Sequence, residues 1–225
     1  GNYGQEPLLR GMTGGQINLT IDGMKMFGAC TDKMDPVSIY IEPQNLKSIQ
    51  ATLGSEGSKL GATVGGSVDM QLAQATLSSK PVSGRAGFGY QSAWNGFNSY
   101  ASANYAQQKS AYYVSLNYRK ADDYRAGGGA VIPYSQYEKI NLSANGKWAV
   151  GQDTLQASAL LDHGYNIGFP ALPMDVGSAK ARIYSIGYQR FRLHERIQNL
   201  NARIYLNLVF HAMDDSHRKN VAMHM

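Results

Sequence analysis

The sequence has little charge, since only 16% of its 225 residues are Asp, Glu, Lys or Arg. An ordinary soluble domain has about 25%. The net charge is only +5, and no run of five or more Lys or Arg residues occurs. A dedicated nucleic-acid surface is usually rich in clustered basic residues, so we expect no nucleic-acid partner.

Cysteine, long apolar runs and an N-terminal leader are also scarce or missing. The single cysteine excludes an intramolecular disulfide. No stretch of 18 apolar residues occurs, which excludes a spanning helix but not a membrane barrel with alternating strands. The chain opens at GNYGQEP, so we expect that any signal peptide has been removed or was never included.

Catalytic motifs are absent as well. Ser, His, Asp and paired carboxylates occur only as scattered residues. The glycine run at residues 127–129 lacks the Lys-Ser/Thr of a phosphate-binding loop. The sequence therefore predicts a protein that is not an enzyme.

Glycine and tyrosine are abundant, with 25 and 15 residues. The first eighty residues are divided by glycines into short β-prone runs, which predict strands at 16–22, 37–42, 47–53 and 67–72. The segment PQNLKSIQ, which begins at Pro43, is compatible with a short helical turn before its strand. This part is typical of a compact domain of small strands.

From about Gly84 onward, longer segments alternate between apolar and polar residues. In residues 139–150 the even positions from Ile140 to Val150 form one apolar face, and the odd positions from Lys139 to Lys147 form a polar one. Residues 199–211 repeat this pattern. Residues 112–118 repeat it too, and weaker segments lie at 84–92, 97–106, 155–161 and 184–188. We therefore expect about seven strands, most of them nine to thirteen residues long.

This alternation fits two architectures. Transmembrane β-strands need roughly 9–11 residues and carry aromatic side chains on the apolar face. A soluble antiparallel sandwich alternates in the same way. The connections at 123–137 and 165–179 are long and the others are short or modest, with the long ones at alternate positions. Outer-membrane barrels have this arrangement.

Ordered motifs in the first half favour the barrel. LLRGM begins at Leu8, INLTIDGM at Ile17, and NLKSIQATLGSEGSKLGATVGGSVDM at Asn45. In order and approximate spacing, this set resembles the plug domain of TonB-dependent outer-membrane receptors. One departure is Ser55-Glu56, where that family commonly has proline after the glycine.

The resemblance implies a mainly β fold. Residues 1–80 would form a plug with a small mixed sheet, its N-terminal part missing, and residues 81–225 the first strands of a large antiparallel transmembrane barrel. Barrels with a plugged lumen have about 22 strands, so we expect the chain to be incomplete. The family implies the outer membrane of a Gram-negative bacterium, contact with its lipid, and energisation by TonB–ExbB–ExbD through a TonB box that is missing here.

Sulfur side chains cluster in MKMFGACTDKMDP. Met24, Met26, Cys30 and Met34 lie within eleven residues. In the receptor family this segment forms a loop at the outward apex of the plug, where substrate is held. Soft sulfur ligands favour Cu(I), with zinc as the borderline competitor.

A second group of donors lies at the end of the last strand. His211 continues the polar face of residues 201–207, and period two places Met213 on the same side. The pairing C-x-x-x-M with H-x-M resembles TonB-dependent copper receptors of the OprC type. It implies copper as the transported substrate, with the ligands Cys30, Met34, His211 and Met213. Secondary copper sites would involve Met24, Met26, Met223, His224 and Met225.

Two alternatives stay open at this point. A lone cysteine is more often a small buried apolar residue than a ligand, so the chain is also compatible with a siderophore receptor of the same fold. A soluble periplasmic copper-binding β-protein is the third hypothesis. The oxidation state of the copper is open too, because imidazole suits Cu(II) and three sulfurs suit Cu(I).

Overall fold

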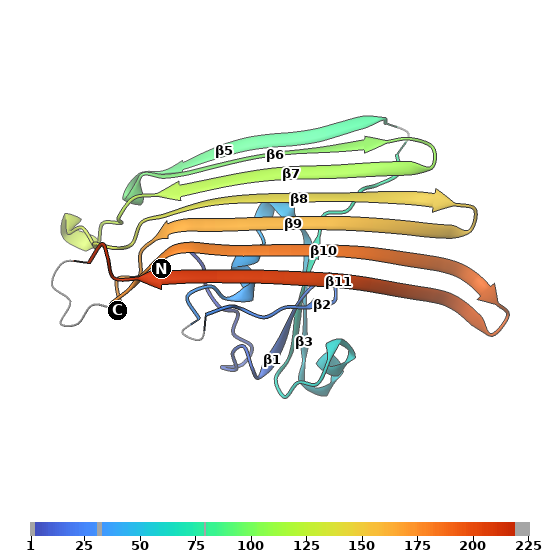
Figure 1. Ribbon diagram of the computed structural model, residues 1–225, viewed down its shortest axis with the longest axis horizontal. Coiled ribbons are helices and arrows are strands. Elements are labelled where there is room, and N and C mark those ends of the chain that lie inside the picture. The colour runs from blue at the N-terminus through green and yellow to red at the C-terminus, as the bar shows by residue number, and fades with distance from the viewer. Residues whose placement is uncertain (1–2, 31–32, 79, 219–225) are drawn as a thin grey trace.

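The computed structural model describes residues 3–30, 33–78 and 80–218, which form two β-sheets (Figure 1). The first sheet has the strand order β2-β1-β4-β3. Strands β1 and β4 are parallel, and the other two pairs are antiparallel, so the predicted small mixed sheet is confirmed. The strands are β1 (Ile17–Ile21), β2 (Met24–Lys25), β3 (Leu46–Leu53) and β4 (Gly66–Leu72).

Three 3₁₀ helices accompany this sheet: η1 (Val37–Tyr40), η2 (Pro43–Asn45) and η3 (Gly54–Leu60). The helical turn expected at Pro43 is η2. The strand predicted for residues 37–42 is wrong, because this segment turns as η1 with the Ile39 N–H donating to the Pro36 carbonyl at 2.9 Å. A helical turn buries three of its four side chains, whereas a strand would direct alternate ones to opposite faces.

The second sheet has seven antiparallel strands in chain order, which confirms the predicted number. Strands β10 and β11 have 20 and 18 residues and are longer than expected. The connection predicted at 165–179 is correspondingly shorter, because β9 continues to Ile167 and β10 begins at Asp175. The strands are β5 (Val82–Gln91), β6 (Gly96–Ala106), β7 (Ser110–Ala121), β8 (Tyr137–Val150), β9 (Asp153–Ile167), β10 (Asp175–His194) and β11 (Ile197–Asp214).

The connections differ between the two ends of the long sheet. One end carries residues 122–136, with the 3₁₀ turn η5 (Gly127–Gly129), and residues 168–174. The same end carries the short turn η4 (Ser92–Trp94). The other end has only short turns at 107–109, 151–152 and 195–196. Strand β11 runs toward the long-loop end, so its last residues lie there. No helix among the described residues has the length and apolarity needed to cross a membrane.

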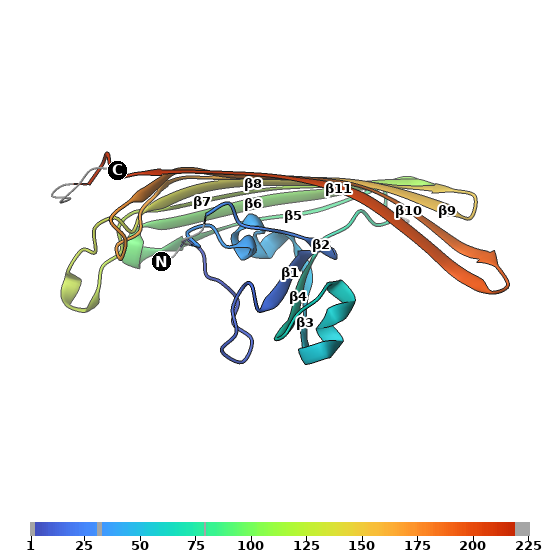
Figure 2. The same ribbon diagram turned by 60° about the horizontal axis from the view of Figure 1, so that its bottom comes forward.

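The two faces of the long sheet differ in chemistry. The face against the small sheet (Figure 2) buries polar side chains such as Asn117, Asn141 and Asp162. The opposite face exposes a band of apolar ones, namely Val114, Leu116, Ile140, Ile186, Leu206, Leu208 and Phe210. A soluble sandwich would cover its apolar face and leave its polar face in water. The long sheet is therefore a piece of barrel wall whose apolar face suits lipid.

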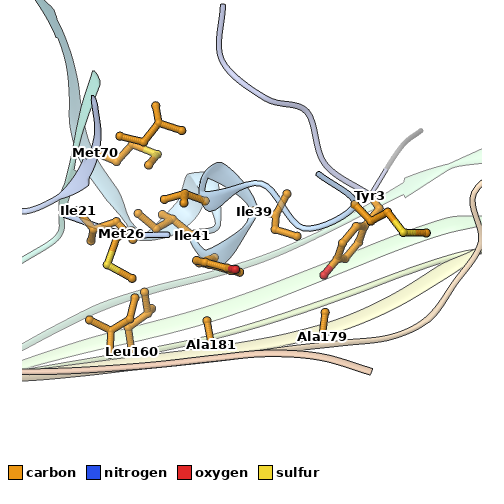
Figure 3. Close-up of a cluster of buried hydrophobic side chains, with 14 of the residues drawn as sticks. Tyr3, Ile21, Met26, Ile39, Ile41, Met70, Leu160, Ala179 and Ala181 are labelled. Atoms are coloured by element: carbon orange, nitrogen blue, oxygen red, sulfur yellow. The ribbon is translucent and has the colours of Figure 1, made fainter. Parts of the chain in front are cut away.

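The hydrophobic core lies between the small sheet and the wall. Figure 3 shows Tyr3 and Met26, from the part of the chain that contains the small sheet, directed at the wall, where small residues such as Ala179 and Ala181 leave room for them. The labelled members from the part of the chain that contains the small sheet are Tyr3, Ile21, Met26, Ile39, Ile41 and Met70, and Leu160 is a further wall member.

A buried ionic cluster also joins the two sheets. The Lys139 ammonium of β8 lies 2.7 Å from Glu42 Oε1 and 3.1 Å from Asp162 Oδ1, and all three side chains are at most 2% exposed. It also donates to the Ile39 carbonyl of η1. Arg119 of β7 lies 3.3 Å from Glu42 Oε2. Each charge therefore has an opposite partner, as burial requires.

A buried amide network continues this attachment beside the charges. Asn45 donates to Asn141 Oδ1 at 2.6 Å and accepts from Ser115 and Asn117 of β7 at 2.6 and 2.8 Å. Asn141 in turn donates to the Tyr40 carbonyl at 3.0 Å. The polar face of the wall thus fixes η1 and η2, and with them the loop that precedes η1.

Candidate metal centre

The loop between β2 and η1 carries the only thiol of the chain. Met26 is buried in the core, Cys30 is half-buried and packs against the core cluster, and Met34 and Asp35 are buried. Residues 31–32 lie outside the described part. Because Pro36 follows Asp35 directly and η1 is fixed on the wall, this end of the loop is held in place.

Asp35 organises the loop through both carboxylate oxygens. Its Oδ1 accepts the backbone N–H of Cys30 at 3.0 Å, and its Oδ2 accepts the hydroxyl of Tyr40 at 3.2 Å. Asp35 is only 1% exposed. Burial and the neighbouring Asp35 charge raise the pKa of the Tyr40 phenol above its usual value, so the hydroxyl stays a hydrogen-bond donor.

The wall contributes His211 from the end of β11, where it pairs with Ala179 of β10. Its side chain is 4% exposed, and its Nδ1 lies 3.4 Å from Asp35 Oδ2. Neither ring nitrogen has a hydrogen-bond partner among the described residues. Buried polar atoms are rarely left without a hydrogen-bond partner, so the imidazole is suited to binding a ligand.

The donor atoms of Cys30, Asp35 and His211 all lie within 4.8 Å of one another. The fold thus brings together two of the predicted ligands that are 181 positions apart in sequence. A thiol, an imidazole and a carboxylate at this separation are suited to a transition-metal ion. A cleft of about 410 Å³ borders Cys30 and Asp35 and connects them to solvent.

The other predicted donors have different surroundings. Met34 is buried beside Asp35 in the core cluster. Met213 pairs with Val176, lies two residues beyond His211 on the same face, and is 38% exposed on the last strand of the sheet. Met24 and Met26 are buried in the core, where they pack. The expectation for Met223, His224 and Met225 falls outside the described residues.

Asp35 is the member of this cluster that sequence reasoning missed. Its signal was weak, because one acidic residue between Met34 and Pro36 is common in any loop. Its position beside a predicted ligand and at the start of a fixed turn was the only indication.

Solved structures of a copper transporter, an iron transporter and a ferric enterobactin receptor resemble most of this chain. The copper transporter OprC superposes with a TM-score of 0.85 at 22% identity, covering 94% of this chain and 32% of that one. The FrpB iron transporter from Neisseria meningitidis gives 0.70 at 17% identity, covering 88% and 34%. The ferric enterobactin receptor PfeA from Pseudomonas aeruginosa, as a mutant, gives 0.64 at 14% identity, covering 88% and 33%. These neighbours are TonB-dependent receptors.

The chain has the fold of a TonB-dependent receptor. Within this fold the four-stranded sheet is the plug and the seven-stranded sheet is part of the barrel wall, which excludes the soluble sandwich. The chain spans about one third of the length of these solved structures. No family model and no curated protein matches the sequence.

The TonB-dependent receptor fold by itself does not give the cargo. Neighbours named for copper, iron and ferric enterobactin share it. All of these names describe transporters or receptors, and none describes an enzyme. The cargo has to be argued from the side chains at the site.

Proposed function

We propose that this chain is part of a TonB-dependent copper importer of a Gram-negative outer membrane. Copper would bind where the plug loop meets β11, with Cys30 and Met34 from the plug and His211 and Met213 from the wall as ligands. The observation that carries this proposal is the buried His211 imidazole, which has no hydrogen-bond partner among the described residues and lies with the only thiol in one cluster. Soft sulfur and imidazole donors favour copper over iron.

The division of the ligands between plug and wall suggests how copper is released. The TonB–ExbB–ExbD system would remodel the plug, and any movement of the plug loop separates Cys30 and Met34 from His211 and Met213. A four-ligand site then becomes two incomplete halves, so the affinity falls at the moment of transport. The thiol must also lose its proton to bind, so copper affinity should fall in acid.

The test is copper binding by the full-length receptor in detergent, with Cu(I) and Cu(II) measured separately by chelator competition. We expect one tightly bound copper per receptor in the wild type. Cys30→Ala, His211→Ala and Met213→Ala should each weaken binding by more than the roughly 10–100-fold typical of outer-shell changes. Met70→Leu alters a buried plug methionine in β4 and serves as the control, with affinity unchanged.

Three results would reject the proposal. Unchanged copper stoichiometry and affinity in all three ligand variants would exclude the site. High-affinity binding of a ferric siderophore with no copper binding would favour the siderophore receptor instead. A receptor that stays soluble, monomeric and folded without detergent would contradict the outer-membrane location.

A further inference from the structure

We propose that Asp35 is a positioning residue, which fixes the tautomer and the ring orientation of His211 so that Nε2 faces the copper. This inference rests on the proposed function, because it assigns a role to a residue beside the ligand set. Three groups surround the Asp35 carboxylate: the His211 ring, the backbone N–H of Cys30 and the Tyr40 hydroxyl.

The carboxylate of Asp35 is held from two sides by groups of the plug. The Cys30 N–H fixes Oδ1 at 3.0 Å, and the Tyr40 hydroxyl fixes Oδ2 at 3.2 Å. An ionised carboxylate oxygen accepts about two hydrogen bonds. Oδ2 therefore retains one acceptor position, and His211 Nδ1 lies 3.4 Å from it. That separation exceeds the usual hydrogen-bond length by a few tenths of an ångström, which a small turn of the ring removes.

The chemistry of the pair selects one tautomer. A carboxylate only accepts, so the neutral imidazole must carry its proton on Nδ1 to interact with Asp35. Nε2 then has a free lone pair, buried and without a hydrogen-bond partner among the described residues. Metal-binding histidines commonly have this arrangement, in which a carboxylate holds one ring nitrogen and the metal takes the other.

The same carboxylate links the two halves of the site. It orders the plug loop through the backbone of Cys30 and orients His211 of the wall, although neither contact uses a donor atom of the predicted ligand set. Loss of Asp35 should therefore affect the imidazole directly and leave the Cys30 thiol in place.

The decisive variant is Asp35→Asn in the full-length receptor, because the amide keeps the shape of the carboxylate. Its carbonyl oxygen can still accept the Cys30 N–H, while its NH₂ group faces His211 Nδ1 and donates to it. The ring proton then moves to Nε2, which no longer has a lone pair for copper. We expect copper affinity, measured with Cu(I) and Cu(II), to fall about 10–100-fold.

A readout without copper tests the tautomer itself. NMR of the metal-free receptor labelled with ¹⁵N-histidine should show His211 protonated at Nδ1 in the wild type and at Nε2 in Asp35→Asn, with His211→Ala assigning the signal. Asp69→Asn is the matched control, since Asp69 is a buried plug carboxylate that accepts from Thr20 Oγ1 at 2.7 Å and from the Gly23 N–H at 2.8 Å. Asp69→Asn should change neither the copper affinity nor the tautomer of His211.

The outcomes separate this inference from the proposed function. An unchanged tautomer in Asp35→Asn overturns the positioning role, even if copper affinity falls, because the residue would then act as a ligand or as a structural support. Unchanged copper affinity in Asp35→Asn, together with loss of copper binding in His211→Ala, also overturns the positioning role of Asp35. Normal copper binding in Cys30→Ala and His211→Ala rejects the copper site, whereas the tautomer of His211 still tests its contact with Asp35.

Discussion

Removal of the Lys139 charge should loosen the plug from the barrel wall. In Lys139→Met the buried Glu42 and Asp162 lose the ammonium that lies 2.7 and 3.1 Å from them. Breaking a buried ion pair from one side costs about 3–5 kcal/mol. Arg119 remains 3.3 Å from Glu42, so most of the loss falls on Asp162 and we expect about 3 kcal/mol. That energy corresponds to roughly a hundred-fold increase in local opening, at about 1.4 kcal/mol per factor of ten.

Hydrogen exchange, measured by mass spectrometry on the full-length receptor in detergent, reports this local opening of the plug directly. Peptides over residues 37–45 should exchange about a hundred-fold faster in Lys139→Met, while the barrel strands keep their protection. Lys147→Met is the control, because Lys147 lies on the same face of β8 and forms no ion pair among the described residues. Adding Asp162→Asn to Lys139→Met should recover part of the lost protection, because it removes the buried charge that has lost its partner. Wild-type exchange in Lys139→Met would refute the claim that this cluster anchors the plug.

Two further substitutions test the wall and the plug separately. Leu206 is 54% exposed in the middle of the apolar face, so Leu206→Lys should destabilise the barrel by about 2–4 kcal/mol in urea titrations in lipid bilayers. Asn201→Lys, on the lumen face, should cost much less, and equal costs would contradict the assigned orientation. Gly66 has φ +121°, and a Cβ there would lie 2.1 Å from the Thr52 carbonyl oxygen, so Gly66→Ala should destabilise the plug by at least about 1–3 kcal/mol. Faster hydrogen exchange in β3 and β4 measures this loss of plug stability, with Gly177→Ala as the control. Equal exchange in the two variants would show that the close approach of Gly66 to Thr52 is not required.

Local pattern was enough for most of the strands. Period-two alternation in β8 and β11 separates the odd, polar positions from the even, apolar ones, and the structure keeps this division along both strands. The pattern failed at residues 37–42, where VSIYIE looks β-prone but turns as η1. Burial against both the plug sheet and the wall outweighed the local preference there.

The pairing of distant charges had no signal in the sequence. Glu42, Lys139 and Asp162 come from three separate segments, and nothing local to any of them indicates that they meet. Asp35 was overlooked for the same reason, since its importance depends on His211, which lies 176 positions later.

The sequence by itself determined most of the strands, the polar and apolar faces, and the two groups of sulfur and imidazole donors, because these follow from spacing along one chain. The tertiary structure decided which face is covered and which donors meet. Alternation is the same in a sandwich and a barrel, and the placement of the plug on the polar face distinguishes them. The contact between Cys30, Asp35 and His211 likewise requires the plug to dock against β11, a relation in space that no local pattern specifies.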